Sequence, residues 1–192
     1  GKIFEPNDPK KPINGNILIK NFKNRITGLF EYEKGKIIFN KASIRNNFLD
    51  GSFIGTISFL PYFNFDLDIA LNSINFTRLY NHFLSFDLEK QKKLFKLNDK
   101  FNGKINFLSD KVYSKHNLVK SFESRIKFYN GNAKIEQFLI NLGKLGAADL
   151  VGTLSNREKY TKFKFESNIF VDNKKKFLSK LGIYNKNINP NL

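Results

Sequence analysis

The sequence predicts a mainly β protein: a long antiparallel meander sheet, curled and with one apolar face, plus two or three short helices. Three observations support this fold class. Apolar and polar residues alternate with period two over many segments, glycine-containing turn dipeptides separate those segments, and helical spacing is confined to short stretches. We expect the 192 residues to form a single β-rich segment, 1–192, of a larger protein.

The clearest alternation lies between residues 52 and 72. Successive side chains of a strand point to opposite faces, so the apolar positions share one face, and Asp66 and Asp68 belong to the other. Pro61 interrupts the pattern and predicts a hairpin around residues 60–62. The apolar positions are Phe53, Ile57, Phe59, Phe63, Phe65, Leu67, Ile69 and Leu71.

A second group of strands is expected between residues 122 and 171. Asn130-Gly131 predicts a tight hairpin turn, because Asn and Gly tolerate positive φ. The alternation slips near Gln137, which indicates a β-bulge. Strands follow over 145–154 and 163–171, and the latter carries Phe163 and Phe165 on one face. Weaker strands fit 13–22, 28–33, 36–44 and 103–108, and short links between strands predict antiparallel neighbours.

Helical spacing occurs in three short stretches, each after a residue suited to capping. Asn75 precedes a helix over 76–84, and Asp87 precedes a second one that ends near residue 97. Asn173 precedes a third helix over 174–181, which Gly182 ends in a left-handed conformation. We expect the polar tail, 183–192, to be loosely ordered.

Composition limits the classes of function. The absence of Cys excludes disulfides, thiol catalysis and cysteine-bound metals. No apolar run is long enough to cross a membrane and no signal peptide is visible, so any membrane anchor is expected outside this segment. The formal net charge of +16 has two interpretations: a solvated, lysine-rich surface, or a surface that binds nucleic acid or another polyanion.

The sequence contains little that indicates catalysis. His82 and His116 lie in polar surroundings without the motifs of a hydrolase or a metal site. Asp66 and Asp68 are spaced to share one strand face, where we interpret them as solvated rather than as a metal or acid–base pair. No phosphate-binding loop is present. We therefore predict no enzymatic activity, no metal and no cofactor.

The apolar face has two possible roles. Three short helices are too few to cover so many strands, so the face either closes on itself as a core or contacts a ligand such as a lipid acyl chain. Aromatic residues and lysines segregate to opposite faces, which argues against a stacking platform for single-stranded nucleic acid. The residues predicted to face lipid are Phe53, Ile57, Phe59, Phe63, Phe65, Leu67, Ile69, Leu71, Phe163 and Phe165.

From about Phe65 to Thr153 the predicted elements come in this order: a strand, a short helix, a strand that opens with glycine, a strand that ends in a glycine hairpin, and a small-residue strand. The segments concerned are 65–76, 101–107, 122–128, 130–135 and 146–154. In this order of elements the stretch resembles the AsmA-like family of bacterial envelope proteins.

That resemblance implies a location and a role. It implies the periplasmic side of the inner membrane, participation in outer-membrane biogenesis, and phospholipid as the molecule contacted or conducted along an apolar β-sheet groove. The expected partners are phospholipid, the remainder of the same polypeptide and other envelope proteins, and nucleic acid is not expected among them. The family has no catalytic motif to transfer. A polyanion-binding module and a structural envelope scaffold are the alternatives.

Overall fold

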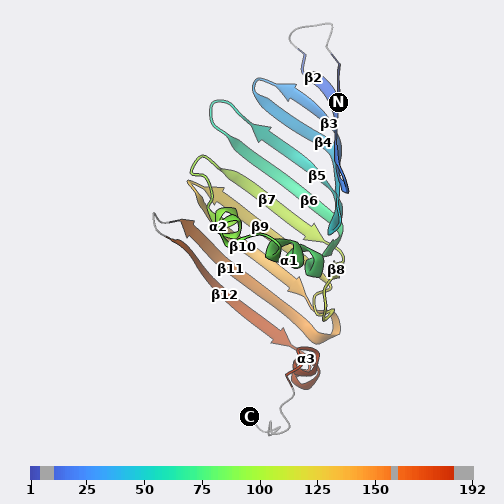
Figure 1. Ribbon diagram of the computed structural model, residues 1–192, viewed down its shortest axis with the longest axis vertical. Coiled ribbons are helices and arrows are strands. Elements are labelled where there is room, and N and C mark those ends of the chain that lie inside the picture. Colours follow the sequence, from blue (N-terminus) through green and yellow to red (C-terminus); the bar gives the residue numbers. More distant parts are fainter. Residues whose placement is uncertain (5–10, 157–159, 184–192) are drawn as a thin grey trace.

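The computed structural model describes residues 1–4, 11–156 and 160–183, which form one open sheet of twelve strands with three short α-helices (Figure 1). The sheet order is β1-β2-β3-β4-β5-β6-β7-β9-β10-β11-β12, and β8 pairs with β6 outside this path. The strands are β1 (Lys2–Phe4), β2 (Ile13–Asn21), β3 (Asn24–Glu33), β4 (Lys36–Arg45), β5 (Leu49–Ser58), β6 (Asn64–Asn75), β7 (Gly103–Ser109), β8 (Val112–Tyr113), β9 (Ser121–Tyr129), β10 (Asn132–Asn141), β11 (Gly146–Asn156) and β12 (Thr161–Val171).

The predicted fold class is confirmed. Sequence neighbours pair antiparallel from β1 to β6 and again from β9 to β12, as the short links require. The β6–β7 pair differs, because it is parallel and runs from Phe65 opposite Gly103 to Leu71 opposite Ser109. Its connection, residues 76–102, contains two helices and is long enough to return the chain to the start of β6.

The three helices are α1 (Phe76–Leu84), α2 (Leu88–Phe95) and α3 (Lys174–Lys180), each preceded by the predicted cap residue. The Asn75 side chain accepts a hydrogen bond from the Arg78 backbone N at 2.9 Å, and Asp87 accepts one from the Lys90 backbone N at 2.8 Å. These contacts satisfy amide groups that have no partner within the helix. A single 3-10 turn, η1 (Gly143–Leu145), precedes β11.

The local features predicted between strands are also present. Asn130 and Gly131 have φ angles of 47° and 71° and form the hairpin between β9 and β10. The register of β10 against β11 shifts between Ile135 and Phe138, which is the predicted bulge. Strands β1 and β8 were not predicted, because two or three residues are too few to show a period. The predicted loose tail falls almost entirely on 184–192, outside the described residues.

The main core lies where α1 meets the sheet. Leu71, Ile74, Val112 and Phe122 form a buried cluster, and Phe76 and Leu79 of α1 pack against it. The Phe76 and Phe122 rings stack with centroids 5.7 Å apart. In Figure 1 the helices α1 and α2 lie in front of the middle strands, and the outer strands on both sides have no helix in front of them.

Burial elsewhere is shallow. Within the described residues only nine apolar residues are buried, and only two of them, Phe65 and Phe122, are phenylalanines. None of the residues in α1, α2 or α3 is buried. A second sheet packed on the first would bury one side of nearly every strand. The described chain therefore folds as a single sheet with a partial helical cover.

Candidate functional site

The strand register places apolar residues from almost every strand on one side of the sheet, which we call the apolar face. Directly paired positions across the sheet lie on the same side. One such row runs from Ile37 through Ile57, Phe65 and Gly103 to Phe128. It continues through Ala133 and Leu154 to Phe163. The apolar face is thus continuous from β4 to β12.

The middle of the apolar face is covered by the connection between β6 and β7. At one end, α1 packs over Leu71 and Phe122. At the other end Phe101, near the end of this connection, lies 4.6 Å from the Phe65 ring and 5.2 Å from the Phe128 ring, measured between centroids. As a result Phe65 is 5% exposed and Leu71 is 3% exposed. The connection between β6 and β7 therefore buries the apolar side chains in the middle of the sheet.

The outer parts of the apolar face are open. On β12 the exposed fractions of Phe163, Phe165 and Ile169 are 49%, 58% and 57%. On the opposite flank Ile19 of β2 is 51% exposed. Burial of such a side chain from full exposure contributes about 1.5–3 kcal/mol, so each of these half-exposed residues would gain about half of that if it were fully covered. The open flank at β12 is therefore a surface with a strong tendency to bind apolar groups.

The ten residues predicted to face lipid differ in position and in exposure. Eight of them lie in strands, and the register puts all eight on the apolar face. Phe59 and Phe63 lie in the link between β5 and β6, where their ring centroids are 6.0 Å apart. Phe65 and Leu71 are covered by protein and are not available to a ligand in this structure. The most exposed members are Phe163 and Phe165 on the flank at β12 and Phe59 in the β5–β6 link.

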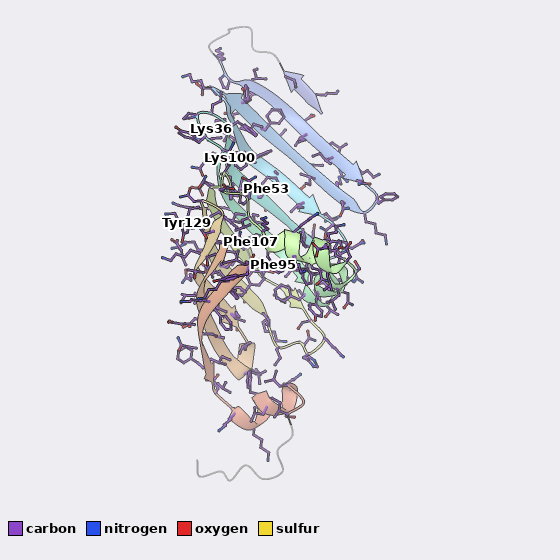
Figure 2. All side chains as sticks on the ribbon, turned by 60° about the vertical axis from the view of Figure 1, so that its left-hand side comes forward. Lys36, Phe53, Phe95, Lys100, Phe107 and Tyr129 are labelled. Atoms are coloured by element: carbon purple, nitrogen blue, oxygen red, sulfur yellow. The ribbon has the colours of Figure 1, made fainter. Side chains whose placement is uncertain are left out.

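The other side of the sheet is polar, and we call it the polar face. Asp66 and Asp68 lie there, both exposed, and the Asp68 carboxylate accepts a hydrogen bond from the Asn106 side chain at 2.6 Å. Figure 2 shows Lys36 and Tyr129 on the side away from the helices, whereas Phe53 and Phe107 lie toward them. The two faces are therefore sorted by polarity as the alternation predicts.

Both histidines are exposed, and neither belongs to a cluster of acidic side chains in the described part of the chain. His82, in α1, is exposed, and its ring stacks on Phe48 with centroids 5.7 Å apart. His116 is exposed in the link between β8 and β9. Over the described residues, no group of three or more His, Asp and Glu side chains is arranged to hold a metal ion. In the same part of the chain, no helix has the length and apolar character needed to cross a membrane.

Two surface pockets lie along the ends of the strands. The larger, of about 460 Å³, is lined mainly by polar-face residues, among them three lysines and Asp66, and also by Phe65 and Phe128. The smaller, of about 370 Å³, contains the Arg45–Asp50 ion pair, in which the guanidinium donates at 2.8 Å and 3.2 Å. These hydrogen bonds from Arg45 hold the pKa of the Asp50 carboxyl below its ordinary value. Both partners are partly exposed, so the pair is a surface feature.

Several residues of the open surface were absent from the predicted site. Ile169 lies on the same face of β12 as Phe163 and Phe165, and the alternation of the sequence was enough to predict this position as part of the site. The extension of the apolar face into β2, β3 and β4 was harder to see, because Gly15 and Gly28 occupy apolar-face positions and interrupt the pattern. The cover by Phe101 depends on how a long connection returns across the sheet.

Comparison with known proteins gives no relative for this chain. The sequence matches no protein-family model, and searches for similar curated proteins and for similar solved structures also found no match. The candidate site therefore rests on the geometry of the chain itself.

Proposed function

We propose that this chain is a non-catalytic, lipid-contacting segment of an AsmA-like envelope protein, which holds phospholipid acyl chains against the open part of its apolar face. The proposal places the chain on the periplasmic side of the inner membrane, in a protein that takes part in outer-membrane biogenesis. The observation that carries it is the exposure of Phe163, Phe165 and Ile169 side by side on β12.

The chemistry of the open flank favours acyl chains over other ligands. The residues of β11 that lie beside the exposed side chains of β12 are small or aliphatic: Gly152 lies opposite Phe165, and Ala148 lies opposite Ile169. An extended hydrocarbon chain needs no hydrogen-bond partner, and each methylene that it buries contributes about 0.8 kcal/mol. The resemblance of residues 65–153 to AsmA-like proteins supports phospholipid as the source of such chains.

Native mass spectrometry of the chain, purified without detergent, tests this proposal. We expect the protein to carry phospholipid, identified by its mass and by extraction. Replacing Phe163, Phe165 and Ile169 with serine should remove most of the adduct, because the variant surface no longer favours hydrocarbon.

A matched control replaces three exposed apolar residues of the polar face with serine: Leu139, Val151 and Phe170. This variant should keep the phospholipid. A chain that carries no lipid, or equal loss of lipid from both triple variants, would contradict the proposal.

A further inference from the structure

The register aligns four lysines in a row across the polar face, and we call them the lysine row. Lys104 of β7 lies directly opposite Lys127 of β9, and Lys127 lies opposite Lys134 of β10. Thr153 of β11 follows, and Lys164 of β12 completes the row. Adjacent strands are about 4.8 Å apart, so the row extends over about 19 Å.

This arrangement has an energetic cost that the fold does not offset. Like charges placed directly opposite each other on neighbouring strands destabilise a sheet. None of the four lysines takes part in an ion pair within the described residues, and all four are exposed. The one carboxylate in the row is Asp66, which lies opposite Lys104 at its end. The other three lysines have no carboxylate directly opposite them, and this local excess of positive charge favours an anionic partner.

The pocket on the polar face adds further donors at one end of the row. Lys104 and Lys127 line it together with Lys36 and with the side chains of Thr56, Ser58, Asn64 and Tyr129, so its three lysines outnumber its one carboxylate, Asp66. Ammonium, hydroxyl and amide groups are the donors that bind phosphate oxygens. Its volume of about 460 Å³ is sufficient for a single phosphate-bearing headgroup.

Exposed apolar residues on the same face distinguish between the classes of anionic partner. Leu108, Leu139 and Val151 are 46%, 41% and 45% exposed, and their register places them with the lysines. Nucleic acid would favour aromatic stacking between the cations, but the aromatic residues exposed on this face, Tyr129 and Phe170, do not lie between the lysines of the row. A broad sheet also does not enter a groove of a duplex. Lysines that contact phosphates beside aliphatic side chains that enter the interface are typical of an anionic membrane surface.

We propose that the lysine row and its adjoining pocket dock the polar face of the sheet on an anionic phospholipid surface. This site is separate from the apolar face, and its occupants are headgroups rather than acyl chains. The proposal does not depend on the lipid-carrying function of the opposite face.

Vesicle sedimentation with the full chain tests the proposal. We expect binding to vesicles of phosphatidylcholine with about one third phosphatidylglycerol, weak binding to phosphatidylcholine alone, and loss of binding when salt is raised from about 0.05 M to about 0.5 M. Changing the four lysines of the row to glutamine leaves a net charge of +12 (16 − 4) and should weaken binding to the anionic vesicles by at least about tenfold.

The control carries the same change of charge elsewhere, with Lys20, Lys41, Lys115 and Lys180, all exposed, changed to glutamine. It should lose less than about threefold in affinity. Equal loss in both variants, equal binding to both kinds of vesicle, or a preference for an oligonucleotide over the anionic vesicles would overturn the proposal. Circular dichroism checks that both variants fold. If the variant with the four lysines of the row changed does not fold, the single changes Lys127→Gln and Lys41→Gln are compared in the same way.

The phospholipid adduct on the apolar face should be unchanged in all these variants.

Discussion

At the scale of single residues, the fold depends on a few side chains beneath α1. Phe122 is 8% exposed, and its ring contacts Phe76 on the helix side and Phe138 on the neighbouring strand, with centroid distances of 5.7 Å and 5.4 Å. It therefore joins the helical cover to the sheet. Most other phenylalanines of the described chain are only partly buried, so they contribute less to stability.

Replacing Phe122 with alanine should lower the free energy of unfolding by about 3–5 kcal/mol, because it removes a buried ring and leaves a cavity. Urea denaturation followed by circular dichroism measures this change. Phe22 is 94% exposed, so Phe22→Ala is the matched control and should leave the denaturation midpoint almost unchanged. Similar midpoints for the two variants would show that the core does not lie where the structure places it.

At the scale of elements, glycine controls how closely the strands and their side chains approach on the apolar face. Gly103 opens β7 with a φ of +151°, and a Cβ atom there would lie 2.6 Å from Cγ of Phe65. Gly182 after α3 also has a positive φ, of +73°, but nothing lies within 4 Å of its Cβ position. Both glycines have a positive φ, which other residues rarely adopt, but only Gly103 is crowded.

Gly103→Ala should therefore destabilise the protein more than Gly182→Ala. Both variants lose the conformational freedom of glycine, but only the first forces a methyl group against the Phe65 ring, which adds about 1–3 kcal/mol. Thermal unfolding of both proteins measures the difference. Equal melting temperatures would mean that β7 and Phe65 are not packed as described.

The elements also show which parts of the fold sequence alone predicts. Strands β5, β6, β9 and β10 were predicted well, because alternation and Asn-Gly turns are local signals. The caps Asn75, Asp87 and Asn173 were predicted for the same reason. The parallel pairing of β6 with β7 was not predicted, because it depends on the path of residues 76–102 across the sheet.

In the candidate site, too, some features follow from local sequence and others depend on the fold. That Phe163 and Phe165 share a face follows from their spacing, but only the fold shows that they are open while Phe65 is covered. The lysine row required the register of five strands, since its members are separated by up to tens of residues in the sequence.

At the scale of the whole molecule, the account describes a sheet with two chemically different surfaces. One face is apolar, covered in the middle by α1 and Phe101 and open at β12. The other face is polar and carries the lysine row. A single exposed sheet of this kind is stable only if its open apolar flank is small or occupied, so the account predicts an occupant for that flank in the cell.

Site-specific photo-crosslinking at two neighbouring positions of β12 tests this central claim most directly. A benzophenone amino acid replaces Phe165 on the apolar face or Lys164 on the polar face, and each protein is irradiated after it has been purified away from membranes with its bound lipid. The account predicts a phospholipid cross-link at position 165 and none at position 164. Cross-linking to protein alone at position 165, or equal capture of lipid at both positions, would contradict it.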